Sequence, residues 1–406
     1  MPRFTLNRPV LVLAGASLIV AIAMGIRQDF GLLLGPITVD RGWTVGTVSL
    51  GFAIQQLAWG LAGPALGVVA DTRGARDVGI LGGVLYATGL LWMALAPTPL
   101  QFHLAAGVLV GAALGATGFS IMMGAVARAA PEAKRGFYLG LAGAGGSFGM
   151  FIFVPLGQWL IGTLGAATAL LGLALLALLM VPLSFLLPGS SDGGAAAGSR
   201  QPAAGPGLAQ TMRLAFRHDG FFLLMAGFFV CGFHVAFLGV HLPAYLASCG
   251  LPASIGAASL ALIGFFNIFG SLAAGHLGGR HRPRNVLVAV YALRGLVIVG
   301  FILLPKSAAS ALIFAALMGG LWLSTVPLTS GVVAGIFGPR YVATLFGFVM
   351  LSHQLGAFLG AWAGGAAFDA TGSYDPVWWI SVALAGFAAL VHLVIRDARH
   401  PAYATA

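Results

Sequence analysis

Twelve mostly apolar stretches, each about 19 residues or longer, follow one another along this chain, and short segments that carry nearly all of its charge separate them. About 20 apolar residues in a helix cross the roughly 30 Å hydrocarbon layer of a bilayer. Only 7% of the residues are charged, against about 25% in a soluble domain. We therefore expect an all-α integral membrane protein with twelve transmembrane helices, at residues 10–37, 48–70, 78–96, 102–127, 137–161, 166–187, 221–246, 255–277, 286–304, 311–336, 342–368 and 377–395.

A repeated loop divides the chain into two halves. Gly67–Arg76 (GVVADTRGAR) lies between the second and third stretches, and Gly275–Arg284 (GHLGGRHRPR) occupies the corresponding place 208 residues later. We expect two pseudo-symmetric six-helix bundles, at residues 1–188 and 219–406. Residues 189–218 between them are expected to be a flexible cytoplasmic linker, since most of that segment is Gly, Ala, Ser and Pro.

The distribution of basic residues predicts the orientation. The formal net charge of +10 does not indicate nucleic-acid binding, because the cations lie in loops, and short cytoplasmic loops collect Lys and Arg. If the N-terminus is cytoplasmic, sixteen basic residues fall inside and only Arg41 and Lys306 fall outside. We expect both termini in the cytoplasm. Eighteen of the twenty basic residues are Arg, which favours a GC-rich bacterial source and hence a bacterial inner membrane.

Three charged side chains, Arg27, Asp29 and Arg294, fall inside the expected spans. A charge at the bilayer centre costs at least about 2.5 to 3.5 kcal/mol, so such residues usually serve a function. A guanidinium can hold a carboxylate through two charge-assisted hydrogen bonds, which makes both arginines candidate substrate-binding residues. Arg27 and Asp29 lie about 200° apart around a helix, so if one faces a cavity the other faces a neighbouring helix. Alternatively, Arg27 snorkels or binds carbonyl groups, and Arg294 pairs with Asp29 or binds carbonyls of span eight or ten.

Histidine changes charge near physiological pH and is suited to carry a proton. His234 and His241 share a face of span seven, and His353 lies near the middle of span eleven. With Asp29 these residues are the proton-coupling candidates, and His234 is preferred because it is near mid-membrane. The alternative for each is a neutral histidine satisfied by a neighbouring helix.

Neutral polar and aromatic residues complete the expected substrate site. Asn267 and Ser271 share a face of span eight at i, i+4, and Trp322 in span ten is suited to contact an apolar part of a substrate. Within spans, such groups also serve as hydrogen-bond partners between helices. The glycines between Gly140 and Gly149 are expected to let span five pack closely or bend.

The first loop also resembles a known motif. Gly67, Asp71, Gly74 and Arg76 match the pattern G-x-x-x-D-x-x-G-x-R/K of the major facilitator superfamily, in the same topological place. The resemblance implies that Asp71 caps a neighbouring helix and latches the two halves in one state. The second copy has Gly279 at the position of the acid.

Within the superfamily the chain is most similar to bacterial relatives of the monocarboxylate transporters. This likeness is seen in three segments, Gly25–Leu34 (GIRQDFGLLL), Trp43–Ser49 and Leu139–Gly149. It implies that Arg27 is the family's basic residue in the first helix. The family's aspartate and arginine in helix eight map onto Asn267 and Ser271, so the ionic pair associated with proton coupling is missing here.

Together these features predict a secondary transporter of a small organic anion, a monocarboxylate, that works by alternating access with proton symport. We expect a monomer without a cofactor, a metal site or a nucleic-acid partner. An enzyme is not expected, since no catalytic motif appears and one intramembrane acid cannot supply both an acid and a base. The alternatives are a proton-driven exporter of lipophilic or drug-like compounds and a membrane receptor or scaffold without transport.

Overall fold

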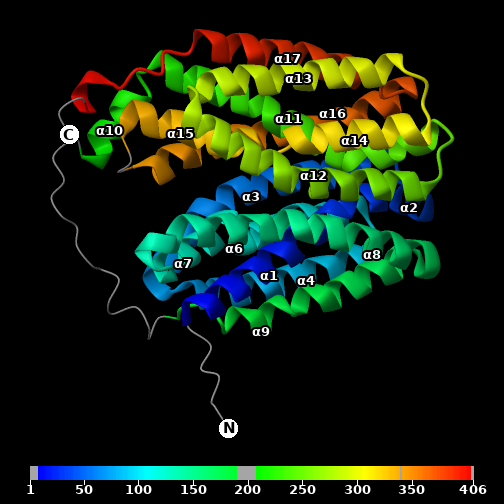
Figure 1. The fold of residues 1–406 in the computed structure, drawn as a ribbon. Coiled ribbons are helices and arrows are strands. Elements are labelled where there is room, and N and C mark those ends of the chain that lie inside the picture. Colours follow the sequence, from blue (N-terminus) through cyan, green and yellow to red (C-terminus); the bar gives the residue numbers. More distant parts are fainter. Residues whose placement is uncertain (1–7, 190–206, 339–340, 404–406) are drawn as a thin grey trace. The chain divides into compact units, whose positions relative to one another are not determined.

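The computed structural model describes residues 8–189, 207–338 and 341–403. It divides the chain into two compact units, Met1–Gly198 and Ser199–Ala406, and the regular elements in the described ranges are helices (Figure 1). Residues 190–206 of the expected linker lie outside those ranges, so their assignment stays a prediction. Later in the same segment, Leu208–Ala215 form helix α10, which the sequence reading placed in the linker.

The helical elements of the N-terminal unit are α1 (Arg8–Gln28), α2 (Phe30–Arg41), α3 (Val45–Arg73), α4 (Ala75–Leu95), α5 (Pro99–Phe102), a π-helical segment (His103–Leu109), α6 (Val110–Thr117), α7 (Phe119–Ala129), a 3-10 turn (Glu132–Lys134), α8 (Arg135–Leu178) and α9 (Met180–Ser184). Those of the C-terminal unit are α10, α11 (Asp219–Ser248), α12 (Ala253–Arg280), α13 (Pro283–Leu303), α14 (Ala308–Leu321), α15 (Thr325–Phe337), α16 (Val342–Thr371), α17 (Asp375–Val394) and a 3-10 turn (Pro401–Tyr403).

In the described part of the chain, 11 helical segments are long and apolar enough to cross a membrane. One of them, Phe137–Ser184, is 48 residues long, which is long enough for two crossings. The break between them is at Gly165, whose φ of 78° lies in the left-handed region that favours glycine. After the break the chain turns back, since Gly172 packs against Leu160. The helices are therefore consistent with the twelve expected crossings.

In the N-terminal unit, α1 and the first half of α8 pack with their backbones in contact. Gly145 lies against Ser17, and Gly149 lies against Ala21, where an added Cβ would overlap the Ala21 carbonyl. Both contacts advance by four residues in the same direction, so the two helices run parallel. Glycines at this spacing remove the side chains that would hold the helices apart. The expectation of close packing by span five is thus confirmed at these two glycines, whereas Gly140 has open space beside it.

The C-terminal unit contains the same kind of contact between α11 and α16. Gly356 lies against the carbonyl of Phe229, and Gly360 lies against the carbonyl of Phe233. This second parallel seam again joins the first and fifth crossings of its unit. At the end of the chain, the Tyr403 hydroxyl donates a 2.6 Å hydrogen bond to Thr211 Oγ1 and thereby ties the terminal segment to α10.

Candidate functional site

The first crossing is interrupted in its second half, where α1 ends at Gln28 and α2 begins at Phe30. Asp29 occupies the break, and its backbone N–H donates to the Ile26 carbonyl over 3.1 Å. The two charged side chains near the break, Arg27 and Asp29, have different surroundings. Arg27 is partly exposed, whereas Asp29 is fully buried.

Two side chains of α3 hold the Arg27 guanidinium. Arg27 Nη2 donates to Gln56 Oε1 over 3.4 Å, and the guanidinium carbon lies 5.3 Å from the centre of the Trp59 ring. A cation over an indole face is attracted by the ring quadrupole. Among the described residues, Arg27 Nε has no hydrogen-bond partner. The guanidinium is thus held in place with part of its donor capacity unused.

Trp59 was missed in the reading of the sequence, although a signal was present. It follows Gln56 by three residues, and residues three apart share a helix face. A polar Gln and a Trp on one face of a span, opposite an intramembrane Arg, would have indicated the contact.

Asp29 faces a neighbouring helix. Its carboxyl group lies against Gly157 of α8, where a larger residue would overlap it. Within the described ranges, neither carboxyl oxygen has a hydrogen-bond partner. The nearby helix α1 also accepts a hydrogen bond from Tyr86 of α4, whose hydroxyl donates to the Ala23 carbonyl over 3.0 Å. A buried carboxylate without partners is costly, so the neutral acid is the form that suits these surroundings.

Arg294 is buried at the break between α14 and α15, with 1% of its side chain exposed. Its Nε donates to the Leu321 carbonyl over 3.2 Å, and Nη2 also donates to the Trp322 carbonyl. This corresponds to the alternative in which Arg294 binds carbonyls of span ten. Trp322 is itself buried, so neither residue presents an open surface to a substrate.

Asn267 and Ser271 stabilise the same break from α12. The Asn267 side-chain oxygen accepts the Leu323 N–H over 2.9 Å and the Ser271 hydroxyl over 3.3 Å. Leu323 lies between α14 and α15, where a backbone N–H lacks a helical acceptor. The contact favours the interhelical hydrogen-bond alternative for Asn267.

The three histidines differ in their contacts. Nε2 of His234 lies 2.9 Å from the Ser381 carbonyl, and Nε2 of His241 lies 2.7 Å from the Ala361 carbonyl. A carbonyl only accepts, so Nε2 carries the hydrogen in both rings. These are the contacts expected of neutral histidines satisfied by neighbouring helices. His353 instead has Nδ1 at 3.2 Å from Gln354 Oε1 and is 8% exposed.

The loop motif, Gly67–Arg76, spans the end of α3 and the start of α4 and contacts the end of the sixth crossing. Gly74 has a φ of 96°, and an added Cβ there would overlap the Pro188–Gly189 backbone. The Arg76 N–H donates to the Pro188 carbonyl over 3.1 Å. A Cβ on Gly67 would meet open space. The side chain of Asp71 lies outside the described part of the structure, so the latch implied by the family resemblance stays a prediction.

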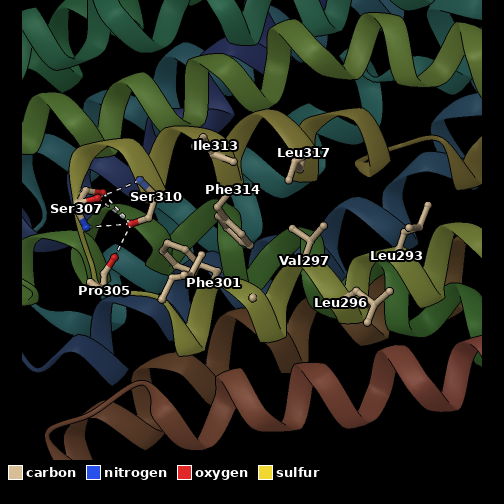
Figure 2. A pocket seen from close by; sticks show the side chains of 12 residues that line it. Leu293, Leu296, Val297, Phe301, Pro305, Ser307, Ser310, Ile313, Phe314 and Leu317 are labelled. Carbon is tan, nitrogen blue, oxygen red and sulfur yellow. Dashed lines mark hydrogen bonds between the residues drawn. The ribbon is translucent and has the colours of Figure 1, made fainter.

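An apolar groove of about 520 Å³ lies in the C-terminal unit between α13 and α14. Figure 2 shows side chains that line it. Branched aliphatic side chains and Phe301 and Phe314, whose rings stack 4.2 Å apart, make up most of its lining. Its hydroxyls, Ser307 and Ser310, lie at one end and cap α14 by bonding to each other and to nearby backbone groups. No charged side chain is part of this lining, so the groove does not suit a carboxylate.

Two multi-helix units that together account for twelve apolar crossings, with charged side chains placed at helix breaks, define a membrane transporter. Comparison with known protein families supports this assignment as a membrane transporter. The model of the Major Facilitator Superfamily matches residues 10–322 and 265–405, and the chain belongs to that family. Its members and the relatives below are transporters, so the expectation that the chain is not an enzyme is confirmed.

Relatives of the chain include monocarboxylate transporters. Mouse monocarboxylate transporter 11 is 30% identical over 383 residues, which cover 90% of this chain and 82% of the relative. An uncharacterized MFS-type transporter of Bacillus subtilis, YcxA, is 23% identical and covers 91% of this chain and 90% of its own length.

Solved structures share the fold. A bacterial homolog of the human lysosomal transporter Spinster, in an inward-facing and unoccupied conformation, aligns with a TM-score of 0.80 at 16% identity, over 98% of this chain and all of the other. The Escherichia coli fucose:proton symporter FucP aligns with a TM-score of 0.62 at 17% identity, over 96% of this chain and 99% of the other. The expected major facilitator fold is thereby confirmed.

Proposed function

We propose that this chain is a secondary transporter that carries a small organic anion, a monocarboxylate, together with a proton. It works by alternating access as a monomer in a bacterial inner membrane, with both termini in the cytoplasm. The observation that carries the proposal is the partly exposed side chain of Arg27, whose guanidinium is held by Gln56 and Trp59 beside a helix break.

The Arg27 site favours an anion over a neutral solute. Its contacts fix the guanidinium but supply no negative charge, since Gln56 and Trp59 are neutral. A carboxylate would add charge-assisted hydrogen bonds and the negative charge that balances the guanidinium. The relatives named as monocarboxylate transporters support the same substrate class.

Substitution of Arg27 tests the substrate class. Loss of a hydrogen bond to a charged group costs about 1.5 to 3 kcal/mol, so Arg27→Gln should weaken carboxylate binding roughly 10-fold to 150-fold. Arg27→Lys should give an intermediate loss, because a point charge replaces the two-pronged contact. Equilibrium binding of one monocarboxylate and its neutral amide to the purified proteins is the measurement.

The amide should bind Arg27→Gln and the wild type almost equally. Arg73→Gln, a matched change at the exposed end of α3, should leave the affinity for both compounds unchanged. Equal losses of acid and amide binding in Arg27→Gln would show that Arg27 supports the fold, and an exporter of lipophilic compounds would then be the better assignment.

Asp29 is the proton carrier in this proposal. It is buried without partners among the described residues and lies two residues from Arg27, so a proton and a substrate charge would meet at one helix break. His234 and His241 already donate to backbone carbonyls, and His353 belongs to the C-terminal unit.

Asp29→Asn keeps the size of the side chain but removes its proton exchange. It should abolish substrate accumulation driven by a pH gradient in proteoliposomes and preserve exchange of labelled for unlabelled substrate. His234→Gln, which retains a donor for the Ser381 carbonyl, should leave both activities near wild type. Loss of accumulation in His234→Gln with normal accumulation in Asp29→Asn would show that His234, and not Asp29, carries the proton.

A further inference from the structure

The apolar groove between α13 and α14 is built from one face of each helix. Most of its lining residues follow the i, i+3, i+4, i+7 pattern of a helix face, along residues 293–304 and 310–317. The stacked rings of Phe301 and Phe314 are buried, whereas the Leu296 side chain is 67% exposed (Figure 2). The groove thus has aromatic rings at its base and exposed aliphatic side chains along its edge.

The length of the groove matches one leaflet of a bilayer. Residues 293–304 of α13 extend over about 17 Å at 1.5 Å per residue, and half of a hydrocarbon layer is about 15 Å thick. One end of the groove is at the polar loop that contains Lys306 and Ser307. The other end is at Leu293, in the middle of the 21 residues of α13. A single acyl chain that enters from the loop has the length to fill this path.

Gly300 provides the room for such a chain. A Cβ added at Gly300 would have no neighbouring atom within 4 Å, so this part of the groove is open. The Ser307 hydroxyl donates to Ser310, and the Ser310 hydroxyl donates to the Pro305 carbonyl, so both are already satisfied. The other lining residues are apolar. The groove therefore offers van der Waals contacts, which suit a flexible hydrocarbon chain.

A positive charge lies at the mouth of the groove. The Lys306 ammonium donates to three carbonyls at the end of α13, over 2.8 to 2.9 Å. Its Nζ is also 5.2 Å from the centre of the Phe301 ring at the groove base. The carbonyls fix the ammonium but are neutral, and none of the acids in the sequence lies between residues 220 and 368. The charge therefore remains available to attract an anionic headgroup at the level of the loop.

We propose that this groove is a binding site for an anionic phospholipid. One acyl chain lies along residues 293–304 and fills the space beside Gly300, and the phosphate lies near Lys306. The charge at the mouth favours this occupant over a neutral lipid. The length of one leaflet favours it over a helix of another chain, which would continue through the membrane. The site goes beyond the proposed function and does not depend on the transported substrate.

Photolabelling in liposomes tests the occupant. The wild type is reconstituted in phosphatidylcholine with a small fraction of phosphatidylglycerol that has a diazirine in its acyl chain, and mass spectrometry locates the labelled peptides. Label should be enriched several-fold on α13 and α14 relative to the exposed side of α17, and it should saturate as that fraction rises. Equal labelling of these surfaces would overturn the proposal, since lipid would then cover the groove only as solvent.

Gly300→Leu and Gly386→Leu form a matched pair of variants. An added Cβ meets open space at both positions, but Gly386 lies on α17, outside the groove. Gly300→Leu should lower the label on α13 and α14 to the level of α17, whereas Gly386→Leu should leave the enrichment unchanged. Full enrichment in Gly300→Leu would overturn the acyl-chain site. If that variant does not fold, Val297→Phe fills the same face of α13 and should have the same effect.

Lys306→Gln tests the charge at the mouth. The glutamine amide retains donors for the carbonyls at the end of α13, so the main change is the loss of charge. One lysine near a membrane surface changes the affinity for anionic lipid about five-fold, and the fraction of phosphatidylglycerol at half-saturation should rise by that factor. Arg41→Gln, at the other basic residue of the expected outer side, should have no effect. Unchanged half-saturation in Lys306→Gln, or equal enrichment of photoreactive phosphatidylcholine, would overturn the selection of an anionic lipid.

Other occupants of the groove give other results. Absence of lipid enrichment together with crosslinks between α13 of two copies would assign the groove to a second copy of the chain. Absence of enrichment together with saturable binding of a lipophilic dye that Gly300→Leu abolishes would assign it to a lipophilic compound. Either result would overturn the lipid site. The labelling does not require transport, so it remains decisive if the proposed function at Arg27 fails.

Discussion

At the scale of single residues, Gly149 and Gly140 differ although both lie on α8. A Cβ on Gly149 would overlap the Ala21 carbonyl, whereas a Cβ on Gly140 would meet open space. Gly149→Ala should therefore force α1 and α8 apart at a cost of about 1 to 3 kcal/mol, the usual range for overpacking. Thermal unfolding of the purified protein should show a lower Tm for Gly149→Ala.

Gly140→Ala is the matched control for this substitution. Alanine has a higher helix propensity than glycine by about 1 kcal/mol, so this variant should be neutral or slightly stabilised. If both variants have the wild-type Tm, the α1–α8 seam tolerates a Cβ and its glycines serve another purpose.

At the scale of elements, the break between α14 and α15 depends on a side chain from α12. The Asn267 oxygen accepts the Leu323 N–H, and removing one partner of a buried hydrogen bond costs about 1 to 3 kcal/mol. Asn267→Ala should thus lower the Tm in detergent. Ser271→Ala, which removes a donor from the same oxygen but leaves the Leu323 contact, should have a much smaller effect. Equal Tm shifts in the two variants would argue against a special role of the Leu323 bond.

At the scale of the whole molecule, the distribution of basic residues predicts how the chain lies in the membrane. A fluorescent protein that folds only in the cytoplasm should fluoresce when fused to the C-terminus. The same protein inserted after Lys306, one of the two basic residues on the expected outer side, should stay dark while expression is verified by immunoblot. Fluorescence from the second fusion would place Lys306 in the cytoplasm and contradict the predicted orientation.

Sequence reasoning recovered the features that depend on local composition. Apolar length gave the twelve crossings, and helical geometry separated the surroundings of Arg27 from those of Asp29. It gave the carbonyls of span ten only as one alternative for Arg294, and it did not recover the helix breaks, because such contacts depend on residues far apart in the chain. The Asn267–Leu323 bond, for example, spans 56 positions. The contact of Trp59 with Arg27 was similarly missed because hydropathy contains no information on which faces meet.

The two glycine seams have a mechanical consequence. Where Gly149 and Gly356 meet a neighbouring backbone, sliding one helix along the other by a single residue would press a side chain into a carbonyl group. The two helices of each seam therefore fit together only at certain offsets along their axes, with matching positions four residues, or about 6 Å, apart. We expect this packing to oppose sliding of α1 along α8 and of α11 along α16, so that each pair moves as a rigid unit. Bending is then expected at the helix interruptions at Asp29 and between Leu321 and Thr325.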